Sequence, residues 1–152
     1  MKTGVRVRDA MTRNPVTVTP DASIKKCAEI MEGNKVGSLV IKKNGSLFGV
    51  IKERDIVRSV VLDNHDAEKE LVENYMIKKV ITITPDVDIY EALLVMRDED
   101  VRMLPVLDGN KLVGLLTVKD ILKIEPALFE LLAEKLILKE EHNKPIFISR
   151  LD

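Results

Sequence analysis

The amino-acid sequence predicts an α/β (α+β) fold in which two β-α-β-β-α repeats pack sheet to sheet with pseudo-two-fold symmetry, followed by a C-terminal helix. When the chain is displaced by 65 residues against itself, residues 11–57 align with 76–122 without a gap, and 13 of the 47 positions are identical. Chance would give roughly three identities. Each copy has the same order of short apolar strands and amphipathic helices. One copy of roughly 50 residues buries too little surface alone, so the two copies should share a core.

The first repeat begins with an alternating strand over residues 16–18, which stops at Pro20 because proline lacks the N–H group that strand pairing needs. An amphipathic helix follows, with an apolar stripe from Ile24 to Met31 at helical spacing. Strands over 39–41 and 47–51 come next and are joined through Asn44-Gly45, whose tolerance of positive φ suits a type I′ hairpin turn. A second helix is expected to begin near Asp55.

The second repeat has the same order: a strand over 81–83, a helix from Ile89, strands over 104–107 and 112–116, and a helix near Asp120. Asp88 and Glu91 have the spacing of a capping box at the start of the first of these helices. After it, Pro126 can occupy the first position of another helix. Between 127 and 140, apolar residues cover more than one helix face. This segment either packs over its own sheets or forms a dimer contact.

These patterns divide the chain into repeat 1 over residues 7–62, a polar linker over 63–71, repeat 2 over 72–124, and a C-terminal helix and tail over 125–152.

Composition excludes several classes of protein. The formal net charge of −1 argues against nucleic-acid binding through bulk positive charge, and a single cysteine excludes an internal disulfide or a multi-cysteine zinc site. No apolar run approaches the ~18 residues of a membrane span, and the first residues do not resemble a signal peptide, so a soluble cytoplasmic protein is expected. Without a P-loop, a serine elbow or a Cys/His pairing, we expect no catalytic residue, no metal site and no enzyme activity. Cys27 is expected in the core, and His65 and His142 on the surface.

Several segments then occur in a characteristic order. The first repeat carries residues 9–11, 15–18, 36–41 and 49–56, and the second carries 101–106 and 114–121. This ordered set, present twice over about residues 7–124, resembles the cystathionine-β-synthase (CBS) domain, whose tandem pairs are called Bateman modules. The resemblance implies a regulatory sensor that binds an adenosine-containing ligand (AMP, ADP, ATP, S-adenosylmethionine or sometimes NAD) in clefts between the repeats. The ligand would shift the packing of the repeats, and a homodimer or an unidentified effector protein would respond.

Thr117 and Asp120 are the foremost candidates for ligand binding. By the resemblance, Asp120 accepts hydrogen bonds from the ribose hydroxyls and Thr117 assists at the sugar or phosphate; a carboxylate offers two acceptor oxygens to a vicinal diol. The same spacing is also close to that of a capping box, and both roles can coexist. Lys119, in the first turn of this helix, indicates a nearby anion. Arg102 would face the ligand phosphates, although a solvated charge explains it equally well.

The first copy departs from this pattern. Lys52 replaces the threonine and Gly37 replaces the arginine, while Asp55 remains and is preceded by Arg54. The ribose carboxylate is thus retained, with two cations close to where a phosphate would lie. We therefore expect the site anchored by Asp120 to be the better adenosine site, and the other to be empty, weak or suited to a more phosphorylated ligand.

The adenine is expected between apolar residues. By analogy with the family alone, backbone groups near Val16 or Ile81 would read its edge.

Two alternatives stay open. The altered first copy favours an interaction or dimerisation scaffold with vestigial clefts. Nucleic-acid binding through Lys25-Lys26, Lys42-Lys43 and Lys78-Lys79 is a more distant alternative, because the charge is balanced and the chain has only five aromatic residues.

Overall fold

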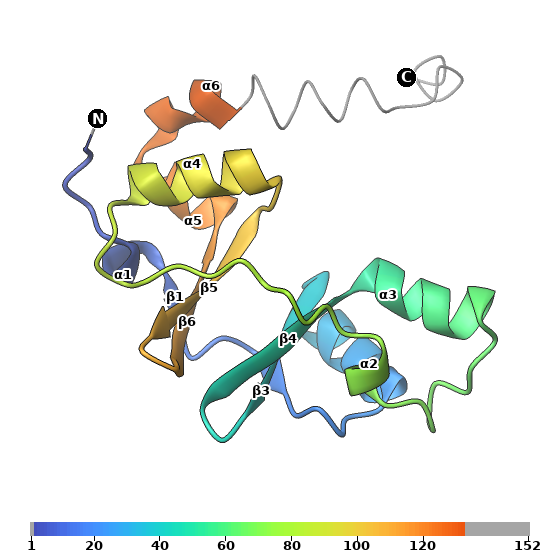
Figure 1. The fold of residues 1–152 in the computed structure, drawn as a ribbon. Coiled ribbons are helices and arrows are strands. Elements are labelled where there is room, and N and C mark those ends of the chain that lie inside the picture. The colour runs from blue at the N-terminus through green and yellow to red at the C-terminus, as the bar shows by residue number, and fades with distance from the viewer. Residues whose placement is uncertain (1, 133–152) are drawn as a thin grey trace, which may run out of the picture.

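The computed structural model describes residues 2–132 and has two bodies, each a three-stranded sheet with helices against it (Figure 1). The first body contains β2 (Thr17–Val18), α2 (Ile24–Asn34), β3 (Ser38–Lys43), β4 (Ser46–Lys52), α3 (Glu53–Val57), the π-helix η1 (Arg58–Leu62) and the 3-10 helix η2 (Val72–Asn74). The second contains α1 (Val7–Ala10), β1 (Thr12–Arg13), α4 (Ile89–Glu99), β5 (Met103–Asp108), β6 (Lys111–Thr117), α5 (Val118–Ile124), the 3-10 helix η3 (Pro126–Leu128) and α6 (Phe129–Leu132). The predicted α+β fold of two repeats is confirmed.

The local signals in the sequence act as expected at most element boundaries. Asn44 and Gly45 have φ values of 53° and 82°, so both residues of the β3–β4 turn are left-handed, as a type I′ turn requires. Asp88 caps α4, but its carboxylate accepts from the Tyr90 N–H rather than from that of Glu91. The expected strand over 81–83 is a single bridge, in which Ile83 pairs in parallel with Val106. It is short because the residues before Ile83 cross from one body to the other.

The segments that lead into the two repeats are exchanged between the bodies. In β1, Thr12 pairs with Leu115 of β6, so the start of the chain completes the second sheet, as Figure 1 shows in blue. The equivalent segment of the second repeat, 65 positions later, lies against the first sheet, where Ile77 pairs with Val50 of β4. The Val7 N–H donates to the Val87 carbonyl at 2.8 Å, and the equivalent Val72–Ala22 bond has the same length. These matched pairs express the pseudo-two-fold symmetry.

The exchange explains two of the identities between the copies. A Cβ atom at Gly114 would lie 2.5 Å from Met11 Sδ, and a Cβ at Gly49 would lie 2.7 Å from the Ile77 carbonyl oxygen and 2.9 Å from Met76 Sδ. Real Cβ atoms are not found at such distances, so glycine at both positions lets the exchanged segment lie against the sheet.

Each body has its own core of buried aliphatic side chains, so the expectation that the two copies share one core is wrong. A copy can bury its own core because the exchanged segments, with Val7 in the second and Val72 in the first, add to it. Cys27 is fully buried in the first core, as predicted, and burial raises the pKa of its thiol to about 11. His65 is exposed, as predicted, with Nδ1 2.7 Å from the Tyr75 hydroxyl. Leu128 is buried in the second core, whereas His142 and most of the apolar segment over 127–140 lie outside the described residues.

Asp88 fastens the start of the chain to the second body, and its removal should destabilise the protein in a pH-dependent way. Partial burial opposes ionisation, but hydrogen bonds from Tyr90 N, the Thr3 hydroxyl, Thr3 N and Gly4 N, all between 2.8 and 3.0 Å, hold the pKa of Asp88 below its usual value. A lowered folded-state pKa gives stability that is present above the unfolded value of about 4 and is lost as pH falls through the folded value. We expect Asp88→Ala to lower the free energy of unfolding at pH 7 by about 1–2 kcal/mol.

The measurement is urea unfolding of the wild type and the variant at pH 7 and near pH 2.5. The difference between their free energies of unfolding should be smaller at the lower pH. Ser23 is the equivalent cap in the first repeat and accepts from the Lys26 N–H at 3.0 Å. Because serine does not titrate, the cost of Ser23→Ala should not change with pH. If the loss of unfolding free energy in Asp88→Ala is also the same at both pH values, the Asp88 charge does not contribute to stability.

Candidate functional site

A cleft of about 820 Å³ lies between the two bodies. The first body lines it with the start of β3, the end of β4 and the first turn of α3, and the second body with residues 100–103, which run from the end of α4 to the first residue of β5. The connecting segment over 77–81 forms another wall. The cleft lies to one side of the pseudo-two-fold axis, which passes between the Ser38 hydroxyl and its own equivalent, Met103, with 3.4 Å between Oγ and Sδ.

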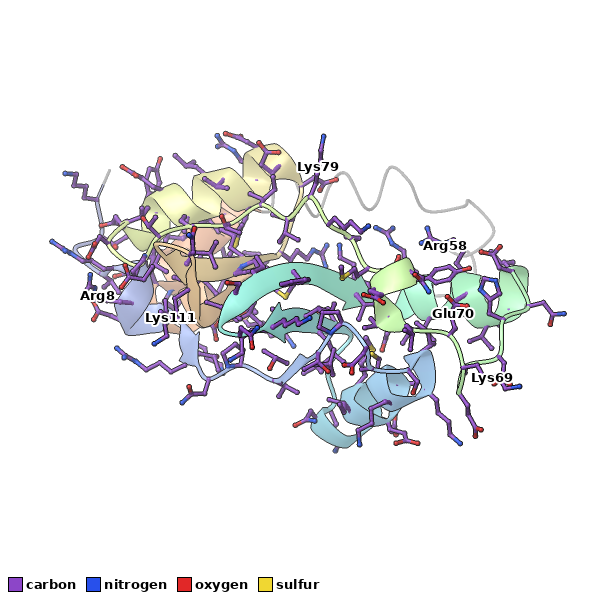
Figure 2. The ribbon with its side chains drawn as sticks, turned by 60° about the horizontal axis from the view of Figure 1, so that its bottom comes forward. Arg8, Arg58, Lys69, Glu70, Lys79 and Lys111 are labelled. Carbon is purple, nitrogen blue, oxygen red and sulfur yellow. The ribbon has the colours of Figure 1, made fainter. Side chains whose placement is uncertain are left out.

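The cleft is strongly basic in a chain that is nearly neutral overall. Four cationic side chains line it, namely Lys52, Arg54, Lys79 and Arg102, with Asp100 as the one carboxylate among its lining residues. Within residues 2–132, the salt bridges do not include Lys52, Arg54 or Lys79. Figure 2 shows Lys79 on the segment that connects the two bodies. An anion entering the cleft therefore meets at least three cations that form no salt bridge with a carboxylate of residues 2–132.

The remaining surface of the cleft is largely apolar. Val50 and Ile77 contribute from the paired backbones of β4 and the exchanged segment, and Ile81, Val101 and Met103 contribute from the second repeat. Ile81 is 37 % exposed, so its side chain is accessible to a ligand. An apolar wall beside fixed charges suits a ligand that has both a flat hydrophobic group and an anionic group.

The two candidate ribose carboxylates both occupy the third position of a helix. Thr117 and Asp120 form a full capping box, in which the Thr117 N–H donates to Asp120 Oδ2 at 2.9 Å and the Asp120 N–H donates to Thr117 Oγ1 at 3.2 Å. Asp55 makes only half of this arrangement: it accepts from the Lys52 N–H at 2.9 Å, but a lysine side chain has no acceptor to return. The capping role weighed for Thr117 and Asp120 is thus present in the structure.

The two carboxylates differ in how readily they can accept further hydrogen bonds from a ligand. Asp55 is only 4 % exposed, and its Oδ1 lies 3.7 Å from Arg58 Nη2. Asp120 is partly exposed, and no described residue donates a hydrogen bond to its Oδ1. Asp120 can therefore cap α5 with one oxygen and offer the other to a ligand.

The predicted site residues fall into two groups. Lys52, Arg54, Ile81 and Arg102 line the cleft together. Val16, Asp55, Thr117, Lys119 and Asp120 are not among its lining residues. Three of these, Val16, Thr117 and Lys119, are the equivalents of Ile81, Lys52 and Arg54. They therefore lie at the symmetry-equivalent position on the other side of the pseudo-two-fold axis. The structure thus places Arg102 with the cations of the first repeat, and the binding roles of all nine residues stay predictions.

Sequence reasoning missed Lys79 as a site residue, because the sequence presents it only as half of the Lys78-Lys79 pair. The signal that could have identified it is its position two residues before Ile81, in the segment expected to lie near adenine.

The described residues contain no group of three His, Cys, Asp or Glu side chains arranged to hold a metal ion. Among residues 2–132, no helix has the length and apolarity that a membrane crossing requires.

Comparison with known proteins identifies the family of the chain. The CBS domain family matches residues 7–62 and 72–126. The chain is 33% identical over 134 residues to the uncharacterized protein MK0525 of Methanopyrus kandleri, covering 87% of this chain and 68% of that protein. It is 29% identical over 115 residues to the CBS domain-containing protein YhcV of Bacillus subtilis, covering 76% and 81% of the two chains.

Among solved structures, the CBS domain NE2398 superposes with a TM-score of 0.71 at 25% identity, covering 79% of this chain and 96% of the other. The CBS domain pair of protein MJ0100, in complex with 5′-methylthioadenosine and S-adenosyl-L-methionine, gives a TM-score of 0.70 at 26% identity, covering 81% and 97%. The chain therefore belongs to the CBS domain family and carries two CBS domains in tandem.

Proposed function

We propose that this chain is a regulatory, non-enzymatic module that binds an adenosine-containing small molecule between its two CBS domains. The observation that carries the proposal is the cleft of about 820 Å³, whose walls come from both repeats and combine apolar side chains with cations. Pockets for small molecules commonly measure about 300–1,000 Å³. The structural neighbour MJ0100 holds two adenosyl compounds and supports the same class of ligand here.

The chemistry of the residues suits the parts of such a ligand. Ile81 and Val101 offer an apolar surface for the adenine ring, and the cations of the cleft offer charge for phosphates. At the equivalent position, the open Oδ1 of Asp120 and the Thr117 hydroxyl offer groups that can bind a ribose diol. Two ligand positions, one on each side of the pseudo-two-fold axis, follow from this division.

A ligand in the cleft would regulate by touching both bodies at once. Any change in their relative packing is limited by the difference in ligand affinity between the two arrangements. We propose that a homodimer partner or an effector protein responds to that change.

Ligand-dependent thermal stability tests this function directly. AMP, ADP, ATP, NAD and S-adenosylmethionine are each added to the purified chain, and the unfolding temperature is measured. A bound ligand at about 100 times its dissociation constant should stabilise the native state by about 2.7 kcal/mol. Guanosine at the same concentration is the control for non-specific effects. Failure of every adenosine compound to shift the transition would contradict the proposal.

An interaction scaffold is the second candidate function, and one observation favours it. The side chains of Val57, Val61 and Leu62 on α3 and η1 are 52%, 69% and 73% exposed. Apolar side chains gathered in this way are typical of protein contacts. A stable dimer whose stability does not respond to any adenosine compound would favour the scaffold.

A further inference from the structure

We infer that the cleft lined by Lys52, Arg54, Lys79 and Arg102, called here the basic cleft, selects adenosine nucleotides with two or more phosphates, and that Lys52 and Lys79 determine this selectivity. The inference rests on the proposed function. It concerns the phosphate chain of the ligand rather than its adenosine.

The charges of the basic cleft come from three stretches of the chain: residues 52–54, the connecting segment and the loop before β5. Lys52 ends β4, Arg54 lies in the first turn of α3, and Lys79 lies on the connecting segment. Because these three side chains take part in no salt bridge among the described residues, their charges are available to a ligand. Lys52 is also half-buried, where reduced solvent screening strengthens its interaction with an anion.

The number of cations in the cleft favours an anion with more negative charge over one with less, because each added charge on the ligand is attracted by all of them. A single phosphate carries at most about two negative charges, which leaves part of the positive charge of the cleft without a counter-charge. A di- or triphosphate carries more negative charge and more acceptor oxygens, so it can form more charge-assisted hydrogen bonds with these side chains. A sulfonium compound such as S-adenosylmethionine carries positive charge next to its ribose, and the same cations repel it.

The pseudo-two-fold symmetry identifies the residues that set this preference. The equivalents of Lys52 and Lys79 are Thr117 and Asn14, which are uncharged, whereas Arg54 corresponds to another cation, Lys119. Lys52 and Thr117 precede their helices with almost the same backbone, at φ −115° with ψ of 161° and 162°. The backbone agrees at Lys52 and Thr117 but not at the other pair, because Asn14 has a φ of 52° and Lys79 has no positive φ. Both pairs differ in charge, so each lysine can be replaced by the uncharged residue of the other repeat.

The first experiment is titration calorimetry of the whole chain with adenosine, AMP, ADP, ATP, S-adenosylmethionine and inorganic tripolyphosphate. We expect ATP to bind the wild type at least tenfold more tightly than AMP, with a steeper loss of affinity as salt is raised. The double variant Lys52→Thr/Lys79→Asn should reduce this preference to less than threefold. The matched control Lys43→Asn/Lys111→Thr removes two exposed lysines at hairpin ends outside the cleft (Lys111 is labelled in Figure 2) and should keep the preference.

The outcomes separate this inference from the proposed function. Equal affinity for AMP and ATP in the wild type, or an undiminished preference in Lys52→Thr/Lys79→Asn, overturns the inference and leaves the proposed function standing. No binding of any adenosine compound overturns both. Tripolyphosphate that binds as tightly as ATP also overturns both, because adenosine then contributes nothing.

A second variant covers the case in which the double variant does not fold. Lys52→Arg/Lys79→Arg retains both charges and should retain the preference for ATP. The inference is wrong if that folded variant loses the preference for ATP. It is also wrong if the affinities of the wild type for ATP and for adenosine depend on salt to the same extent. Neither result requires the Lys52→Thr/Lys79→Asn variant.

Discussion

Asp120→Ala is expected to weaken adenosine-ligand binding at the site anchored by Asp120 about a hundredfold. The open Oδ1 and its partner oxygen can accept about two charge-assisted hydrogen bonds from a ribose diol, and their loss corresponds to roughly 3 kcal/mol. Calorimetry with AMP gives the dissociation constant of the wild type and the variant. An unchanged value would remove Asp120 from the site.

The capping role of the same side chain has to be separated from binding. Asp120 Oδ2 accepts from the Thr117 N–H, so the alanine variant should also lose about 1 kcal/mol of stability. Asp120→Asn keeps an acceptor for the cap but loses the charge, and it should lose most of the affinity while keeping most of the stability. Asp108→Ala removes an exposed carboxylate from the β5–β6 hairpin and serves as the control for net charge.

Gly49→Ala is expected to lower the free energy of unfolding by about 2–3 kcal/mol. The added Cβ would lie 2.7 Å from the Ile77 carbonyl, which accepts a hydrogen bond from the Val50 N–H at 3.0 Å. A backbone group cannot rotate away as a side chain can, so the exchanged segment must separate from β4. For a chain of this length the unfolding temperature should fall by roughly 4–12 °C in a calorimetric scan.

Two other glycines provide the comparison. Gly33 lies in α2, and a Cβ added there would meet no atom of another segment within 4 Å, so Gly33→Ala should stabilise the protein by about 0.5–1 kcal/mol. Gly114→Ala would meet first Met11 Sδ, a side-chain atom, so adding Met11→Ala should recover part of its cost. If Gly49→Ala and Gly33→Ala unfold at the same temperature, the close packing of the exchanged segment is wrong.

The elements of the fold could be predicted from the sequence because their signals are local. The helical stripe from Ile24 and the Asn44-Gly45 turn act within a few residues, and both are confirmed. The exchange of the leading segments could not be predicted in this way. Met11 and Met76 are identical, as are Gly49 and Gly114, so the pattern alone fits either methionine against either glycine.

The same ambiguity limited prediction of the site. Motif positions identified Lys52, Arg54, Ile81 and Arg102 as candidates, and the structure brings them together. Which repeat each one faces depends on how the two bodies pack, and a repeated sequence does not encode that choice locally. The motif order groups Arg102 with Asp120 of its own repeat, whereas the side chain lies across the cleft from the first repeat.

The exchange also determines how the two bodies are tethered. Within residues 2–132, the chain passes between them twice, over residues 14–16 and 78–82. These two connecting segments contain Val16 and the stretch from Lys79 to Ile81. Any hinge motion between the bodies must therefore occur at the segments beside which a nucleotide would bind. A molecule bound there would contact the connecting segments themselves. Its release would let the two bodies move relative to each other while both cores stay intact.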